Sequence, residues 1–320
     1  MPLSSRNIVT YSPAYTIVPT YECFNRCSYC NFCTEPGKSP WLTLGKAQEI
    51  FLQLKNQNIC EILILSGEVH PYSSRREAWF GRIYDLCVLA LEMGFLTHTN
   101  VGPLSWSEMQ KLKTVNVSMG LMLEQLTPKL LNTVHRHAPS KLPEVRSQQL
   151  QWAGELKIPF TTGLLLGIGE TEEDWWETLT AISESHSNYH HIQEVILQPH
   201  SPGTMQTFNA PPFNPYQLPE VIAKAREILP IDIAIQIPPN LIKDKSWLLA
   251  CIAAGARDLG GISPKDEVNP DYPHLQDQEL TSILEPGNWK LIPRLPVYPQ
   301  FDHWLNASLL QQVQKWRARF

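Results

Sequence analysis

The sequence predicts an α/β protein built as a (β/α)8 barrel of the TIM type. Apolar, β-branched runs alternate with segments of helical periodicity along most of the chain. These runs are apolar on both faces, which is typical of parallel strands covered by helices. Eight candidate strands over about 250 residues fit a barrel better than an open doubly wound sheet, the alternative architecture. Because the sequence contains no linker, charge block or internal repeat, we interpret residues 1–320 as a single domain.

The eight candidate strands are short runs rich in Val, Ile, Leu and Thr. In chain order they are residues 14–20, 61–66, 95–100, 115–121, 159–166, 192–198, 232–237 and 256–259. The third and fourth strands, and the seventh and eighth, lie close together in the sequence. The connections between them therefore have to be short.

Helices are predicted between the strands. Residues 43–58 and 217–229 repeat apolar side chains at positions i, i+3, i+4 and i+7, the spacing of one buried helix face. Thr171, with Asp174 three residues later, resembles a capping box and predicts a helix over Glu172–Ser185.

Composition and charge exclude several classes of protein. Apolar residues make up 43% of the chain and charged residues 18%, which excludes intrinsic disorder. A net charge of −5 without a long basic run gives no electrostatic signal for nucleic acid. No secretory signal and no stretch of about 18 apolar residues is visible, so we expect a soluble, cytoplasmic protein without a membrane partner.

Prolines concentrate in the second half of the chain. Of the 27 prolines, 16 lie beyond residue 190, and a Pro-rich C-terminal part begins at about residue 199. Because proline fixes φ, we expect rigid loops after the later strands. In a barrel, such loops form the mouth where ligands bind.

The seven cysteines divide into a cluster and three isolated residues. In a reducing compartment a tight cluster indicates metal binding rather than disulfides, whereas an isolated cysteine in an apolar stretch is typical of core packing. The cluster is Cys23, Cys27, Cys30 and Cys33, and the isolated residues are Cys60, Cys87 and Cys251.

The cluster loop, residues 23–33, directly follows the first predicted strand, where a barrel builds its active site. Three thiolates, from Cys23, Cys27 and Cys30, could hold three irons of a 4Fe-4S cluster and leave the fourth iron open. Their Cys-x3-Cys-x2-Cys spacing, with Tyr29 before the last cysteine, resembles the signature of radical S-adenosylmethionine enzymes. The alternative is a zinc site with Cys33 as fourth ligand; otherwise Cys33 is a free thiol near the cluster.

That resemblance extends to contacts for S-adenosylmethionine. The tripeptide Ser66-Gly67-Glu68 resembles a Gly-Gly-Glu element that receives the methionine ammonium. Residues 163–171 resemble a Gly-x-Ile-x-Gly-x-x-Glu element near the adenine, in which Gly167 is the second glycine, Leu165 takes the Ile position and Thr171 the Glu position.

Two charged residues complete the expected cofactor site. The resemblance implies a carboxylate near the ribose, for which we select Glu124, and a guanidinium on the methionine carboxylate, for which we select Arg146. Ser118, which begins the phrase ending at Glu124, is included among the cofactor contacts, as is the aromatic Tyr29.

Longer phrases resemble one branch of the superfamily, the CofG-type subunit of 7,8-didemethyl-8-hydroxy-5-deazariboflavin synthase. They cover nearly the whole chain and are found at residues 118–124, 158–171, 192–196, 237–241 and 260–264. Two departures affect substrate contacts: residues 198–203 and the segment after Glu68 differ from the pattern expected for the family. In the second, His70 is either a proton-transfer group or a turn histidine bonded to backbone.

The resemblance implies a lyase that uses a 5'-deoxyadenosyl radical on an adduct of a ribitylaminouracil and a tyrosine-derived hydroxybenzyl group, releasing ammonia as the deazaflavin ring closes. Ser263 and Asp266 are expected to contact this small-molecule substrate. The implied partners are the tyrosine-using subunit of the same synthase and a reducing electron donor. The alternatives are that tyrosine-cleaving subunit itself, another small-molecule radical enzyme, or a zinc-stabilised binding protein without turnover.

Overall fold

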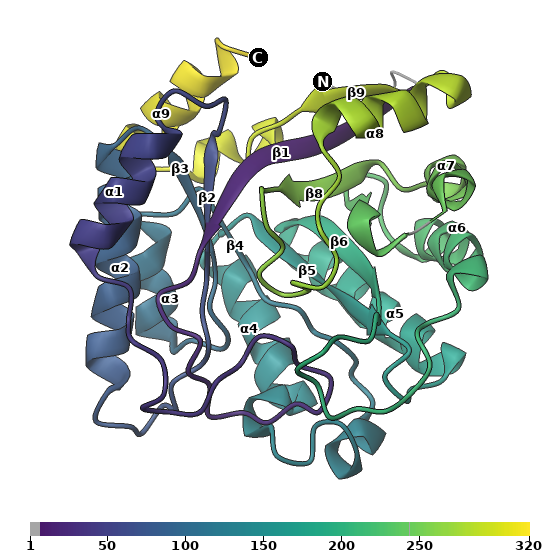
Figure 1. Cartoon of the computed structure of the whole chain (residues 1–320), viewed down its shortest axis with the longest axis horizontal. Coiled ribbons are helices and arrows are strands. Elements are labelled where there is room, and N and C mark those ends of the chain that lie inside the picture. Colours follow the sequence, from purple (N-terminus) through teal and green to yellow (C-terminus); the bar gives the residue numbers. More distant parts are fainter. Residues whose placement is uncertain (1–6, 243) are drawn as a thin grey trace.

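The computed structural model describes residues 7–242 and 244–320, and its centre is a sheet of parallel strands (Figure 1). Every predicted strand is present, and the described residues contain one more. The strands are β1 Ile8–Ile17, β2 Glu61–Leu65, β3 Leu96–Asn100, β4 Ser118–Gly120, β5 Phe160–Leu166, β6 Ile192–Pro199, β7 Ala234–Gln236, β8 Asp258–Ile262 and β9 Lys290–Pro293.

The first eight strands close into a barrel. Neighbours follow the order β2 to β8 and then β1, and β1 also pairs with β2, which completes the ring. All of these pairings are parallel. The predicted (β/α)8 architecture is confirmed, and the open doubly wound alternative is wrong because an open sheet would leave β1 and β2 unpaired with each other.

The first strand is longer than predicted because it has two neighbours along one edge. Thr10 is in register with Asp258 of β8 on one side and with Ile292 of β9 on the other. Farther along, Ala14 is in register with Glu61 of β2. The strand β9 therefore continues the edge that β2 occupies, and it extends β1 back to Ile8.

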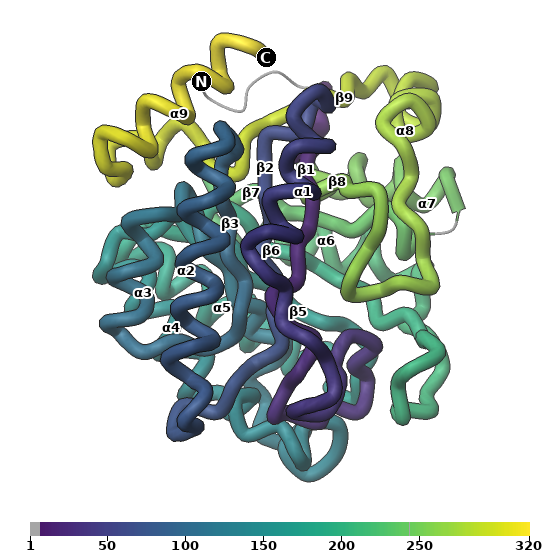
Figure 2. The backbone as a smooth tube through the Cα atoms, turned by 60° about the vertical axis from the view of Figure 1, so that its left-hand side comes forward, coloured from purple at the N-terminus to yellow at the C-terminus, as the bar shows by residue number. Residues whose placement is uncertain are grey.

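Helices surround the barrel, and Figure 2 shows them on its outer side. Short helices fill the two short connections: α3 has 8 residues and α7 has 10. The α-helices are α1 Leu44–Leu54, α2 Arg76–Glu92, α3 Trp106–Lys113, α4 Pro143–Glu155, α5 Glu172–Tyr189, α6 Leu218–Ile228, α7 Lys245–Ala254, α8 Asp277–Leu284 and α9 Ala307–Arg317. The 3-10 helices are η1 Pro128–Asn132, η2 Pro139–Lys141, η3 Pro215–Gln217, η4 Pro239–Leu241, η5 Glu285–Gly287 and η6 Pro299–Trp304.

Local sequence signals set where helices begin. The hydroxyl of Thr171 accepts a hydrogen bond from the backbone N–H of Asp174 at 3.4 Å, and the Asp174 carboxylate accepts one from the Thr171 N–H at 2.8 Å. This confirms the predicted capping box of α5, which runs four residues past the predicted end to Tyr189. None of the helices in the described residues is long and apolar enough to cross a membrane.

The C-terminal segment closes the end of the barrel at which the strands begin. Residues 294–298, here called the plug, lie against the barrel: the Pro296 carbonyl accepts hydrogen bonds from Ser118 Oγ at 2.5 Å and Gln193 Nε2 at 3.0 Å. Behind the plug, Val313 and Trp316 of α9 belong to a separate buried apolar cluster with Leu96. In Figure 1, α9 lies at the end opposite the loops that follow β1.

Candidate active site

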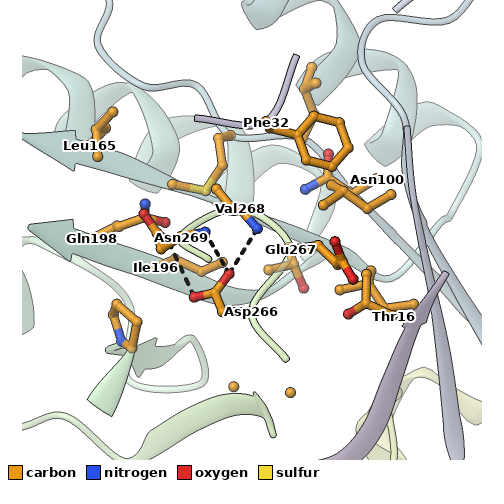
Figure 3. Close-up of a pocket in the computed structure, with 18 of the residues that line it drawn as sticks. Thr16, Phe32, Asn100, Leu165, Ile196, Gln198, Asp266, Glu267, Val268 and Asn269 are labelled. Atoms are coloured by element: carbon orange, nitrogen blue, oxygen red, sulfur yellow. Dashed lines mark hydrogen bonds between the residues drawn. The ribbon is translucent and has the colours of Figure 1, made fainter. Parts of the chain in front are cut away.

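A cavity of about 360 Å³ occupies the barrel at its other end, where the strands finish. Seven barrel strands contribute to its wall, as does the loop after β4, and Figure 3 shows part of the lining. One lining residue from each is Thr16, Leu63, Asn100, Leu121, Leu165, Ile196, Gln236 and Leu259. All four clustered cysteines also line this cavity, which confirms that the cluster loop lies at the predicted end of the barrel.

The cluster loop is fixed by backbone hydrogen bonds to two neighbouring loops. The N–H of Phe24 donates to the carbonyl of Glu68 at 2.9 Å, beyond β2. The N–H groups of Arg26 and Ser28 donate to the carbonyls of His137 and Val134 at 2.7 and 3.0 Å, beyond β4. Backbone hydrogen bonds to two other loops thus hold the segment that carries the thiols.

The thiols themselves suit a bound metal cluster. Cys23, Cys27 and Cys30 are free, and none is in a disulfide. Burial raises the pKa of the Cys23 thiol to about 12 and that of Cys27 to about 11, so both are protonated unless a cation replaces the proton. A thiolate-rich, enclosed donor set of this kind fits an iron-sulfur cluster.

The fourth clustered cysteine is close to the third. A side-chain hydrogen bond joins Cys33 and Cys30, and the Cys30 sulfur also accepts from the Phe32 N–H at 3.4 Å. Cys33 is half-buried on the cavity wall. The expectation that Cys33 lies near the cluster position agrees with this geometry, and its exclusion from the ligands stays a prediction.

Glu68 and Arg146 meet beside the thiols. Arg146 NH2 lies 3.3 Å from Glu68 Oε1, and Asn25 of the cluster loop donates to Glu68 Oε2 at 2.9 Å. Arg146 is buried on α4 and is oriented by two carbonyls, those of Ser140 and Met122, at 3.0 and 2.6 Å. A carboxylate and a guanidinium at one edge of a cavity can receive the ammonium and carboxylate groups of an amino acid.

Gly67 is required by close approach of two chain segments. A Cβ atom at Gly67 would lie 2.2 Å from the Glu22 carbonyl oxygen, and the Gly67 N–H donates to the Thr20 carbonyl at 2.8 Å. The loops after β1 and β2 therefore pack backbone to backbone, which places Glu68 next to the thiols.

Glu124 reaches the cavity through an uncommon backbone conformation. Its φ of 62° is in the left-handed region, and its carboxylate forms a 2.5 Å ion pair with Lys141. Burial alone would raise the pKa of Glu124, but Lys141 and Arg146 lower it below the usual range. Nearby, the Tyr29 hydroxyl lies 2.9 Å from His135 Nε2 and lines the cavity.

Four of the predicted site residues are not brought to the cavity. Ser118 is buried below it, with its hydroxyl bonded to His98 and to the plug. His70 is exposed and its Nδ1 accepts from the Tyr72 N–H at 3.2 Å, so it is the turn histidine of the two readings. Gly167 and Ser263 are in turns outside the lining.

Those two turns have their own hydrogen bonding. The Gly167 N–H donates at 2.6 Å to Glu170, which also accepts from Trp175. Glu170 is three residues after Gly167, where the pattern has its Glu, so the assignment of Thr171 to that position is wrong. The Ser263 hydroxyl donates to the Lys265 carbonyl at 2.5 Å.

Asp266 does lie on the cavity wall, but its carboxylate organises its own loop (Figure 3). It accepts hydrogen bonds from the N–H groups of Val268 and Asn269, both at 2.9 Å, and from Asn240 Nδ2 at 2.9 Å. The loop after β8 thereby presents Val268 and Asn269 to the cavity.

Sequence reasoning missed Lys141 and the polar residues at the bottom of the cavity, here called the floor, which lie near the starts of the strands. The floor contains Glu61, His98, Thr161 and Glu194, with Arg294 from the plug. The available signal was an ionisable residue within a predicted strand: Glu61 in β2, His98 in β3 and Glu194 in β6. Burial raises the pKa of Glu194 to about 7, against the lowering effect of Arg294.

The barrel and its thiol loop define the class of protein, and comparison with known proteins agrees. The family model described as the Radical SAM superfamily matches residues 17–182, which include the three cysteines, Gly67, Glu68, Glu124 and Arg146. The chain therefore belongs to the Radical SAM superfamily and is a radical S-adenosylmethionine enzyme. Membership in this superfamily favours iron and sulfide over the zinc alternative.

Comparison with curated relatives assigns the chain to one group within the superfamily. A 7,8-didemethyl-8-hydroxy-5-deazariboflavin synthase of Trichormus variabilis is 75% identical over 310 residues, which are 97% of this chain and 91% of the relative. The synthase of Gloeobacter violaceus is 54% identical over 97% of this chain and 96% of the relative. Within the superfamily, the chain belongs to the 7,8-didemethyl-8-hydroxy-5-deazariboflavin synthases.

Solved structures share the fold. The FeFe-hydrogenase maturase HydG from Carboxydothermus hydrogenoformans superposes with a TM-score of 0.74 at 15% identity, covering 98% of this chain and 78% of that chain. Methylornithine synthase superposes with a TM-score of 0.70 at 18% identity, covering 94% and 87%. At these identities the likeness concerns the barrel alone.

Proposed function

We propose that the protein is the radical lyase that forms 7,8-didemethyl-8-hydroxy-5-deazariboflavin. Its substrate is the adduct of a ribitylaminouracil with a tyrosine-derived hydroxybenzyl group, and ammonia leaves as the ring closes. The observation that supports this proposal most strongly is the cavity itself: one enclosed space connects the thiols of the cluster loop, the charged groups beside them and the barrel interior.

The proposal assigns a holder to each part of the cofactors. Cys23, Cys27 and Cys30 would bind a 4Fe-4S cluster and leave one iron open, because three thiolates satisfy only three irons. When bound, this cluster together with S-adenosylmethionine supplies one-electron chemistry that removes a hydrogen atom from an unactivated carbon. Cys33 is not a ligand in this assignment.

The chain's own residues orient S-adenosylmethionine. The Glu68 carboxylate, adjacent to Gly67, would accept from the ammonium, and Arg146 would donate to the carboxylate. Glu124 uses one oxygen for Lys141 and has the other available for ribose hydroxyls. Tyr29 forms part of the cavity wall, and its hydroxyl is held by a hydrogen bond to His135.

Two partners follow from the proposed chemistry. The adduct has to come from a reaction that joins a tyrosine fragment to the ribitylaminouracil, for which we propose the tyrosine-using subunit of the same synthase. A reducing electron donor has to supply one electron to the cluster.

The residues near Asp266, above all Asn269, are proposed to contact the uracil portion of the substrate.

The experiment is an anaerobic reaction of the iron-loaded protein with the adduct, S-adenosylmethionine and a reductant. A fluorescent deazaflavin and an equivalent amount of 5'-deoxyadenosine are expected. Formation of 5'-deoxyadenosine without deazaflavin would refute the proposal. A parallel reaction with tyrosine and the ribitylaminouracil tests the tyrosine-cleaving alternative, which predicts turnover there and none with the adduct.

A further inference from the structure

The barrel interior has an unusual vertical order. Barrel interiors are normally filled by layers of apolar side chains. Here Leu63, Leu65, Leu165 and Ile196 line the middle of the cavity beside polar residues of the neighbouring strands, whereas the floor contains charged side chains. At about 3.3 Å per residue, Glu61 lies about 13 Å below Leu65 along β2. Ionisable side chains are therefore at both ends of the cavity, and the leucines lie between them.

The floor has more carboxyl groups than Arg294 pairs with, and burial raises the pKa of Glu61 and of Glu194. Arg294 holds Asp258 with two hydrogen bonds, at 2.6 and 2.7 Å, and also forms an ion pair with Glu194. Glu61 is buried, accepts a hydrogen bond from Ser12, and forms no ion pair with any described residue. A buried carboxylate with so few donors is expected to have another partner.

His98 contributes an acceptor of fixed orientation. The Ser118 hydroxyl gives its single proton to the Pro296 carbonyl at 2.5 Å, so it has to accept at its 2.7 Å contact with His98 Nδ1. The proton of the imidazole is thus on Nδ1, and Nε2 has a free lone pair. No described residue hydrogen-bonds to Nε2, and burial lowers the pKa of His98 to about 3, which keeps the ring neutral.

From this geometry we propose that Glu61, His98 and Glu194 form a polyol subsite, in which three acceptors on three strands receive the hydroxyl groups of a linear polyhydroxylated chain. The inference rests on the proposed function, in which that chain is the ribityl group of the substrate. The uracil and hydroxybenzyl rings then lie in the middle of the cavity, beside the leucines and below the S-adenosylmethionine site.

Other occupants fit this floor less well. A phosphate or carboxylate would meet the carboxyl groups of Glu61 and Glu194, and the Arg294 guanidinium already has two partners. The acceptor atoms of Glu61, His98 and Glu194 are not close enough to share a metal ion. A phenol offers one donor for three acceptors, and its ring would lie among charged groups rather than against the leucines above.

The test compares the adduct with an analogue whose ribityl chain is replaced by an n-pentyl chain. For the wild-type protein we expect a KM for the ribityl adduct about 100-fold lower than for the pentyl analogue, since bonds to buried charged acceptors are each worth about 10-fold or more. In Glu61→Gln, the KM for the ribityl adduct should rise at least about 10-fold, while that for the analogue stays unchanged.

Glu108→Gln is the matched control. Unlike Glu61, Glu108 forms an ion pair with an arginine, Arg76, and lies outside the cavity. The ratio of the KM values for the pentyl and ribityl substrates should therefore equal that of the wild type. Should Glu61→Gln not fold, the wild-type comparison decides alone: equal KM values for the two substrates would overturn the subsite.

Two further outcomes have distinct meanings. A third substrate lacks the phenolic hydroxyl and keeps the ribityl chain. If Glu61→Gln changes the KM ratio for loss of the phenolic hydroxyl and not the ratio for loss of the ribityl hydroxyls, the phenol occupies the floor and the polyol subsite is refuted. If the wild type makes no deazaflavin from the ribityl adduct, the proposed function fails. In that case, equilibrium binding of the two substrates to the wild type still tests the subsite.

Discussion

At the scale of single residues, the clustered cysteines differ in what their loss should cause. Cys27→Ala is expected to abolish the brown colour, the bound iron and 5'-deoxyadenosine formation, because three thiolates are the minimum for the proposed cluster. Cys33→Ala should keep all three near the wild-type level. Anaerobic iron and sulfide analysis with a deoxyadenosine assay measures both variants. Loss of iron in Cys33→Ala would show that the ligand assignment is wrong.

Buried histidines make stability depend on pH. Burial lowers the pKa of His98 and of His191 to about 3, whereas in the unfolded chain each titrates near pH 6.5. Below pH 6.5 the unfolded state binds more protons, so the free energy of unfolding falls as the pH drops toward 3.

His191→Gln tests this dependence away from the cavity. The free energy of unfolding is measured by anaerobic urea unfolding at pH 7.5 and pH 5.5. Its decrease between these two pH values should be about 1.4 kcal/mol smaller in His191→Gln than in the wild type. His70→Gln, at an exposed histidine, is the control variant. An unchanged fall in His191→Gln would mean that this ring is protonated in the folded protein.

Residue roles were predictable from sequence only where spacing carried the information. The thiols and the Gly67-Glu68 pair have a local pattern, and the structure brings them together. Ser118 was assigned from its place in a phrase, although its side chain points to the plug, which is 178 residues away in sequence. Lys141 has no local pattern. The floor residues are marked only as single ionisable residues within strands, and that they meet could not be predicted because they come together only through barrel closure.

At the scale of elements, the loops after β1 and β2 are closely packed against each other. Gly67→Ala would force a Cβ to within 2.2 Å of the Glu22 carbonyl, so the loops after β1 and β2 would have to separate. We expect at least about 10-fold weaker binding of S-adenosylmethionine, measured by equilibrium dialysis, since 1.4 kcal/mol of misplacement suffices for that loss.

Gly45→Ala is the comparison for that variant. Gly45 is in the first turn of α1, where an added Cβ meets nothing within 4 Å. Alanine there should leave cofactor binding unchanged and stabilise the helix by up to about 1 kcal/mol. Equal cofactor affinities in Gly67→Ala and Gly45→Ala would contradict the close-packing argument.

The elements themselves were largely predictable because barrel strands are buried on both faces and read as apolar runs. The first strand was predicted too late, at residue 14, since Ile8–Tyr11 includes polar residues and forms a strand only by pairing with β9. The strand β9 has only four residues, which alternate between exposed and partly buried, so its sequence gives no signal for a strand.

At the scale of the whole molecule, the C-terminal segment covers the end of the barrel at which the strands begin. Trp316 of α9 is 6% exposed, and its Nε1 donates to the Gly94 carbonyl at 2.8 Å. Trp316→Ala should lower the free energy of unfolding by about 3 to 5 kcal/mol, measured by denaturant unfolding. The exposed neighbour Gln314→Ala should change it by less than about 0.5 kcal/mol. Similar values for the two variants would show that α9 contributes little.

The plug also has a consequence for the order of events during turnover. Among the described residues it blocks the end of the barrel opposite the thiols, so a molecule on the floor has to enter and leave past the cofactor site. If the polyol chain binds there, steady-state kinetics should show compulsory order. The adduct binds first, and deazaflavin leaves last, behind methionine and 5'-deoxyadenosine. Product inhibition measures this order, and deazaflavin should inhibit competitively against the adduct. Release of deazaflavin would then have to wait until methionine and 5'-deoxyadenosine have left.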